Sequence, residues 1–363
     1  MSTQNGTSRR RFAFVAASLA WVVVHALYAG TPAAAGEVPR MNIGYTVLDF
    51  KYKSGTEEKT VTTAVWYPTD ARTKIHVYGG STSGELAVDG ALKHGGPYPL
   101  LVFSHGYGGG GLTAVFLTEE LAARGWIVVS PDYNDRHSAV RIRKGQQGFD
   151  RAGLFSHARE IADSTIDDRN AYRYRYDELR TVLNGIIASP GFGPSIDTGK
   201  IALGGHSFGG YTALGLCGTL PELKDSRIKA VVLFSTGTGT CLYTPEEMAA
   251  VKMPVMLFLG ERERDEKRGE RTMADLADAA YRCFPATKYY LEVKGASHFS
   301  FNNRFSDNTW AQRMSGTETE FGVIRKYSVA FLERHILGDE HAVVILSGND
   351  TRLTRYEHRE TDR

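Results

Sequence analysis

Apolar and amphipathic stretches alternate along most of this chain. Continuous apolar runs occupy residues 99–104, 126–130 and 255–259, and largely apolar runs with one or two charged residues occupy 228–234 and 288–293. Such runs are typical of strands that are buried on both faces of a parallel sheet. Stretches with helical spacing of their apolar positions lie at 112–124, 157–188, 271–283 and 318–336. This alternation predicts an α/β protein with a mostly parallel, twisted sheet and helices on both of its faces.

The ends of the chain and its longer insertions follow other patterns. Residues 41–68 are rich in β-branched and aromatic side chains, which predict two antiparallel strands. Residues 69–97 contain several glycines and predict a loop. We expect a helical, cap-like insertion at 138–190 and, because the sequence there is polar, a frayed tail at 347–363. The chain from residue 36 to residue 363 is interpreted as a single domain.

The first 35 residues have the pattern of an export signal. A basic segment with three arginines at 8–12 precedes an apolar stretch at 14–28, and three alanines follow at 33–35. The apolar stretch is shorter than the roughly 20 residues that cross a bilayer. The pattern predicts a twin-arginine signal, cleavage before Gly36, export to the periplasm or the outside, and no stable membrane insertion afterwards.

The charge balance argues against a nucleic-acid-binding protein. The full chain has 43 Lys and Arg against 41 Asp and Glu, a formal net charge of +2. Residues 1–35 contain three arginines and no acid, so their removal leaves 40 basic against 41 acidic side chains, or a formal charge of −1. Nucleic-acid-binding domains are usually strongly basic. The sequence does not indicate an oligomeric state.

A nucleophile elbow is predicted at residues 205–209, Gly-His-Ser-Phe-Gly, which match the pattern G-x-S-x-G. A short run of β-forming and small apolar residues precedes the pattern, and a helix-compatible segment follows it. The serine of such an elbow sits in a sharp strand-to-helix turn, where the chain passes too close to itself for a Cβ at either glycine. Ser207 is therefore the candidate nucleophile.

A serine nucleophile needs a base, and the base needs an acid to orient it. His298 follows the last apolar run and completes the chain order serine, acid, histidine that accompanies this elbow. The acid is expected after the run at 255–259, where two carboxylates compete. The usual spacing favours Glu263, and Asp265 would serve if two residues bulge.

A tetrahedral oxyanion needs two hydrogen-bond donors. One candidate is the backbone N–H of Phe208, which directly follows the nucleophile. The other is the backbone N–H of Tyr107, in the glycine-rich loop 105–111 that follows the apolar run at 99–104.

Four segments resemble a known family. They are PLLVFSHG at 99–106, SPDYNDRHSA at 130–139, KIALGGHSFGG at 200–210 and GASH at 295–298. The first three are similar to secreted platelet-activating factor acetylhydrolases and their dienelactone-hydrolase-like bacterial relatives. The fourth is similar to the histidine loop of bacterial cutinase-type polyester hydrolases. The resemblance implies an α/β-hydrolase fold, no cofactor or metal, and hydrolysis of short-acyl or lipid esters.

One departure from the acetylhydrolases concerns the acid. These enzymes carry it after the strand equivalent to 228–234, whereas residues 234–237 here have no carboxylate. The placement at 263 or 265 instead follows dienelactone hydrolases and cutinases.

The sequence thus predicts an exported serine esterase that forms an acyl-enzyme on a small-molecule or lipid ester, with a role in lipid degradation. A polyester hydrolase of the cutinase type is one alternative. A catalytically silent binding module of the same fold is another, although such modules usually lack a member of the triad. A peptidase of this fold is disfavoured because the chain has no room for a separate propeller-like domain.

Overall fold

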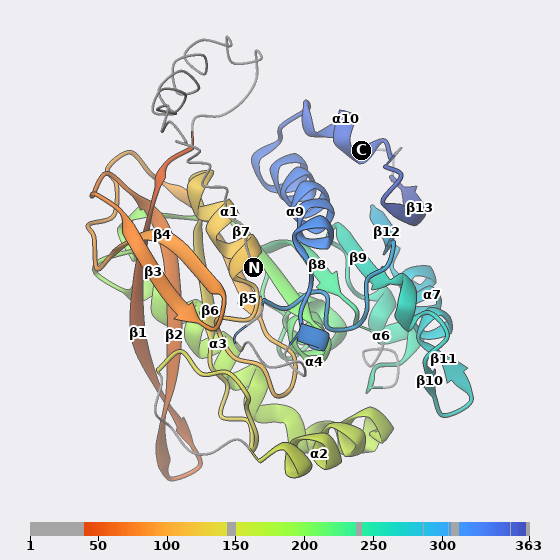
Figure 1. Ribbon diagram of the computed structural model, residues 1–363. Helices are drawn as coiled ribbons and strands as arrows, with labels where there is room; N and C mark the ends of the chain where they lie inside the picture. The colour runs from red at the N-terminus through yellow and green to blue at the C-terminus, as the bar shows by residue number, and fades with distance from the viewer. Residues whose placement is uncertain are drawn as a thin grey trace, which may run out of the picture. The chain divides into compact units, whose positions relative to one another are not determined.

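A sheet of eleven strands forms the centre of the chain (Figure 1). The computed structural model describes residues 40–143, 150–236, 242–285, 287–303, 305, 312–348 and 350–360, and the predicted export signal lies outside them. In spatial order the strands are β13 (Leu353–Arg359), β12 (Lys288–Val293), β9 (Val255–Gly260), β8 (Ile228–Phe234), β7 (Ile196–His206), β5 (Tyr98–Ser104), β6 (Ile127–Pro131), β2 (Glu57–Thr69), β1 (Asn42–Ser54), β4 (Thr82–Val88) and β3 (Lys74–Gly79). The six strands from β12 to β6 run parallel, and β13 and β2 join them antiparallel at either side.

Helices cover both faces of this sheet, and each face has its own core. On one face, Leu100 and Val102 of β5 pack in a cluster with α3 (Arg173–Ala188), α4 (Phe208–Leu214) and α7 (Met273–Cys283). On the other face, Leu101 and Phe103 join α1 (Val115–Ala123) and α9 (Glu318–Leu332). This alternation along one strand is the physical reason why the inner strands read as continuous apolar runs.

Shorter elements make up the rest of the described chain. These are α2 (Arg151–Asp163), η1 (Ile166–Tyr172), η2 (Gly193–Ser195), η3 (Gly215–Thr219), α6 (Pro245–Ala249), η4 (Glu261–Glu263), η5 (Glu333–Leu337), α10 (Ala342–Leu346) and the small hairpin of β10 (Lys267–Arg268) and β11 (Arg271–Thr272). Together with α3, the elements α2 and η1 fall within the insertion expected at 138–190. None of the helices in the described ranges has the length and hydropathy of a bilayer-spanning segment.

The predicted α/β class and the two antiparallel strands at 41–68 are confirmed, but the loop predicted at 69–97 is wrong. This segment contains the hairpin of β3 and β4, which extends the edge of the sheet. The buried aromatic side chain of this hairpin is Tyr78, which packs edge-on against Tyr45, at 5.5 Å between ring centroids, and accepts a hydrogen bond from Trp66 Nε1. Two apolar residues of β3, Ile75 and Val77, face solvent. The strand therefore lacks the apolar-in, polar-out alternation by which strands are recognised.

The frayed tail predicted at 347–363 is also wrong over residues 353–359. These residues form β13, which pairs antiparallel with β12. Its side chains are bound by polar contacts rather than by burial: Arg355 Nη1 donates to Asp278 Oδ1 at 2.7 Å, and Thr354 Oγ1 donates to the buried Glu292. A polar edge strand of this kind gives no hydrophobic signal in the sequence, because only its partner strand supplies the reason for it to be extended.

Candidate active site

Ser207 lies in the turn between β7 and α4, in the strained geometry that the sequence pattern predicts. Its φ is +52° and its ψ −121°, outside the regions that non-glycine residues ordinarily occupy. A Cβ on Gly205 would lie 2.6 Å from the carbonyl carbon of Gly209, and a Cβ on Gly209 would lie 1.9 Å from Ser104 O. Both flanking glycines are therefore required by close backbone approach.

The structure brings Ser207, His298 and Glu263 together at the carboxyl ends of β7, β12 and β9. Ser207 Oγ lies 3.0 Å from His298 Nε2, and His298 Nδ1 lies 3.0 Å from Glu263 Oε2. Glu263 is completely buried, whereas Asp265, the other predicted candidate for the acid, is exposed. Only Glu263 of the two is found in contact with the imidazole.

The loop at 260–263, which carries Glu263, and the loop at 294–298, which carries His298, are joined through their backbones. Gly260 N donates to Glu263 Oε1 at 2.7 Å, which fixes the carboxylate against the end of β9. Arg262 N donates to Ala296 O at 2.8 Å. A Cβ on Gly260 would lie 2.6 Å from the same Ala296 oxygen, so this glycine permits the two loops to touch.

His206, which precedes the candidate nucleophile, contacts the main chain of the loop that carries His298. Its Nε2 lies 2.8 Å from His298 O. Burial first, and then the neighbouring His298, lower the pKa of His206 well below its ordinary value, so its ring is neutral. Because a carbonyl oxygen can only accept, the single ring proton of His206 is on Nε2 and is donated to His298. His206 thus positions the main chain of the candidate base.

The loop that carries Tyr107 lies directly against Ser207, the candidate nucleophile. A Cβ on Gly106 would lie 2.9 Å from His206 Nδ1 and 3.2 Å from Ser207 Cβ. The amide of Phe208, the second predicted oxyanion donor, is at the first residue of α4, where helical N–H groups have no intrahelical acceptor.

The ring of His105 fixes the direction of the Tyr107 amide. Its Nδ1 is 2.7 Å from Gly106 O, and Tyr133 N donates to its Nε2 at 3.2 Å. Burial, and next the charge of Arg175, lower the pKa of His105 to about 3, so the ring is neutral with its proton on Nδ1. The carbonyl of Gly106 therefore points toward the His105 ring, which donates to it. In a trans peptide the N–H of Tyr107 must then point the opposite way.

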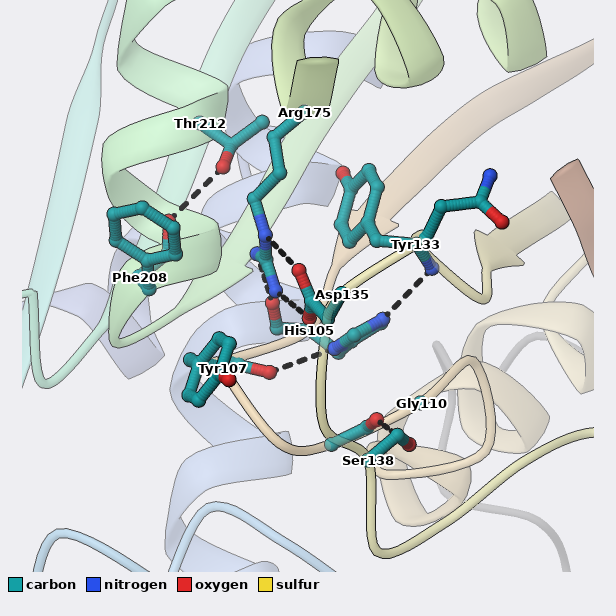
Figure 2. Close-up of polar contacts among 12 residues, drawn as sticks. His105, Tyr107, Gly110, Tyr133, Asp135, Ser138, Arg175, Phe208 and Thr212 are labelled. Carbon is teal, nitrogen blue, oxygen red and sulfur yellow. Dashed lines mark hydrogen bonds and ion pairs between the residues drawn. The ribbon is translucent and has the colours of Figure 1, made fainter. Parts of the chain in front are cut away.

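A buried ion pair between Arg175 and Asp135 packs against the segments that carry both predicted oxyanion donors (Figure 2). Arg175 Nη1 donates to His105 O at 2.9 Å, and Arg175 Nε donates to Asp135 Oδ1 at 2.9 Å. Both side chains are completely buried. Burial alone would raise the pKa of Asp135, but Arg175 outweighs it and holds that pKa below its ordinary value. The guanidinium also lies over the rings of Tyr133 and Phe208, at 4.4 and 4.8 Å from their centroids.

We expect Arg175→Met to lower the free energy of unfolding by about 3–5 kcal/mol, because it leaves Asp135 charged and unpaired inside the protein. Urea denaturation would measure this loss. The matched control is Arg143→Met, which removes a partner of Asp49 in an exposed pair at 2.8 Å and should cost no more than about 1 kcal/mol. Similar losses in the two variants would contradict the structural role assigned to Arg175.

A cavity of about 170 Å³ opens over Ser207 and His298. Its walls are mostly apolar and come from the Gly106 loop, from the segment between β6 and α2, from α2 itself and from the segment after β12. They include Tyr107, Val140, Leu154, Phe299, Phe305 and Met314. The polar side chains of Asn302 and Asn303 line it as well. In the described ranges, no group of three or more His, Cys, Asp or Glu side chains is arranged to hold a metal ion.

Sequence reasoning missed three groups of this site: Ser235, whose Oγ lies 2.6 Å from His298 Nδ1, then His206, and the Arg175–Asp135 pair. The strongest available signal was for Ser235, which follows β8 where the resembling acetylhydrolases carry their acid. The pattern G-x-S-x-G leaves the residue before the serine open, so it gives no role to His206. Nothing in the sequence pairs Arg175 with Asp135, because they come from different elements 40 residues apart.

The fold and this serine–histidine–carboxylate arrangement together define a hydrolase of the α/β class. A family model described as "Alpha/beta hydrolase family" matches residues 100–360, and the chain belongs to this family. This confirms the fold inferred from the resemblance.

Among individual proteins, the chain is similar to Cutinase 1 of Thermobifida cellulosilytica, with 26% identity over 69% of this chain and 78% of that protein. It is also similar to the platelet-activating factor acetylhydrolase of Cavia porcellus, with 24% identity over 68% of this chain and 59% of that protein. A ferulic acid esterase from Streptomyces cinnamoneus has the same fold, with a TM-score of 0.64 at 21% identity, over 84% of this chain and 93% of that structure.

Proposed function

We propose that this protein is an exported serine carboxylic-ester hydrolase that acts through an acyl-enzyme on short-acyl or lipid-type esters. The observation that carries the proposal is the continuous contact from Ser207 Oγ through the His298 ring to the buried Glu263, each step at 3.0 Å, at the floor of an apolar cavity. Membership of the α/β-hydrolase family and similarity to cutinases and acetylhydrolases support it.

In the proposed acylation step, Ser207 Oγ attacks the ester carbonyl carbon while His298 Nε2 takes the serine proton. Negative charge develops on the former carbonyl oxygen, where the N–H groups of Tyr107 and Phe208 stabilise it. Glu263 stabilises the imidazolium through Nδ1. His298 then returns the proton to the leaving alcohol oxygen as the carbon–oxygen bond of the ester breaks.

In deacylation, a water molecule takes the place of the alcohol. His298 Nε2 accepts a proton from the water as its oxygen attacks the acyl carbon, and the same two amides bind the oxyanion. The proton then passes to Ser207 Oγ as the acyl bond breaks, which releases the carboxylic acid and restores the free serine. These steps require no group beyond the chain and water.

The cavity favours an apolar acyl group of limited length. Leu154 of α2 and Phe299, Phe305 and Met314 of the segment after β12 provide the apolar surface, and burial of such surface in the complex favours binding. A second candidate, a polyester hydrolase, is favoured by the similarity to several cutinases of Thermobifida.

A panel of p-nitrophenyl esters from acetate to palmitate, assayed beside a polyester film, tests the proposal. We expect kcat/KM to be highest for the short acyl chains and to fall for the long ones, because the cavity is small. Release of soluble acid from the film at a comparable rate would favour the second candidate. If no ester is cleaved by the folded protein, the silent binding module becomes the better interpretation.

For export, the protein recovered outside the cytoplasm should begin near Gly36, which N-terminal sequencing would show.

A further inference from the structure

Ser235 directly follows β8 and is buried beneath the imidazole of His298. Its φ is +49°, and its N–H donates to Phe258 O of the neighbouring strand at 2.8 Å. In the described ranges only three non-glycine residues have a positive φ, namely Asp89, Ser207 and Ser235. Strained backbone of this kind is found mainly at functional sites, and two of these three residues touch His298.

The hydroxyl of Ser235 lies between the candidate base and the candidate acid. Its Oγ is 2.6 Å from His298 Nδ1 and 2.5 Å from Glu263 Oε2. The direct separation of Nδ1 and Oε2 is longer, at 3.0 Å. Of these two oxygens, the hydroxyl oxygen of Ser235 is therefore closer to Nδ1 than the carboxylate oxygen.

The available protons determine the direction of each bond. A carboxylate can only accept, so Ser235 donates its single hydroxyl proton to Glu263 Oε2. For Nε2 to accept the proton of Ser207, the proton of the neutral ring must be on Nδ1. This N–H then donates to Ser235 Oγ, and more weakly to Oε2. Glu263 Oε1 is already bound by Gly260 N at 2.7 Å.

We infer that Ser235 is a positioning residue that links His298 Nδ1 to Glu263 and keeps the imidazole in the tautomer that can accept a proton from Ser207. The inference rests on the proposed ester hydrolysis. When His298 becomes positively charged, the hydrogen bonds from Nδ1 to Ser235 Oγ and from Ser235 to Glu263 Oε2 let the buried carboxylate stabilise that charge. No covalent bond is made or broken at Ser235, and its proton stays on Oγ.

The first test is Ser235→Ala, measured with a short-chain p-nitrophenyl ester. We expect kcat to fall about 10- to 100-fold with KM within twofold, because substrate binding does not involve this hydroxyl. The matched control is Thr236→Val, which removes a buried hydroxyl from the next residue, whose one hydrogen bond within the described part of the chain is a 3.5 Å contact with Phe234 O. Its kcat should stay within twofold of the wild type. Thermal unfolding would show that both variants are folded.

A kcat within twofold of the wild type for folded Ser235→Ala would overturn the inference. If Ser207→Ala is inactive in the same assay, that result leaves the proposed hydrolysis intact. If Ser207→Ala is instead as active as the wild type, the proposed function itself fails. The two failures are therefore distinguishable.

A second test moves the carboxylate to position 235. Glu263→Ala removes the acid and leaves space beside it, and Ser235→Asp in this background returns a carboxylate next to Nδ1. Aspartate and asparagine both tolerate a positive φ, so Ser235→Asn in the same background is the matched control without charge. We expect the aspartate to restore at least tenfold in kcat over Glu263→Ala alone and the asparagine to restore nothing. Equal activity of the two double variants would show that position 235 does not act on Nδ1 and would overturn the inference, even if Ser235→Ala fails to fold.

Discussion

Ser207→Ala is expected to abolish ester hydrolysis, with a loss in kcat that approaches about 10⁶-fold, the precedent for a nucleophilic serine that acts with its histidine as a unit. The hydroxyl oxygen of this residue lies 3.0 Å from His298 Nε2, and the chain order and elbow assign it the attack on the ester. Rates with a p-nitrophenyl ester would measure the loss. A fluorophosphonate should label the wild type at Ser207 and leave the variant unlabelled.

The fold should survive this substitution. The strained backbone at φ +52° is held by the close approach of Gly205 and Gly209, and alanine has the same Cβ as serine at this position. We therefore expect an unchanged thermal midpoint. Ser347→Ala, which removes an exposed hydroxyl far along the chain, serves as the matched control and should keep full activity. Retention of more than a few per cent of activity by Ser207→Ala, with contamination excluded, would falsify the assignment of the nucleophile.

Glu263→Gln is expected to lower kcat at least a hundredfold, toward the roughly 10⁴-fold known for neutralisation of a triad acid. The reason lies in the hydrogen bonds of the buried carboxylate. Oε1 accepts from Gly260 N at 2.7 Å, and Oε2 accepts from Ser235 and His298. An amide has only one accepting oxygen. If its NH₂ faces Nδ1, it favours the tautomer with the proton on Nε2, which cannot take a proton from Ser207. If its NH₂ faces Gly260, two donors meet in a buried site.

The matched control for this variant is Asp265→Asn. Asp265 is two residues away in the same charged segment and is exposed, so its neutralisation should change kcat less than fivefold. The reverse pattern, with Asp265→Asn the more damaging change, would transfer the role to Asp265 and require a different loop after Gly260 in solution. If neither substitution reduces kcat, the acid lies elsewhere.

The sequence left open which of two carboxylates is the acid of the site. Glu263 and Asp265 are both carboxylates in a run of alternating charges, and no local pattern separates them. The structure distinguishes them by burial and by distance from the imidazole, because the path of the chain after β9 turns one side chain inward and the other outward. Their roles in the reaction are what the paired variants test.

The sequence by itself determined the features that depend on near neighbours in the chain. The continuous apolar runs predict the inner parallel strands because both faces of these strands are covered, and Gly205 and Gly209 predict the elbow because their close approach is local to the turn. Only the tertiary structure decided the features that depend on partners far along the chain. The polar strand β13 is extended because β12 pairs with it, and Arg175 is tolerated in the interior because Asp135 neutralises it. Ser235 meets His298 and Glu263 only where β8, β9 and β12 end side by side, and no spacing within the sequence carries that information.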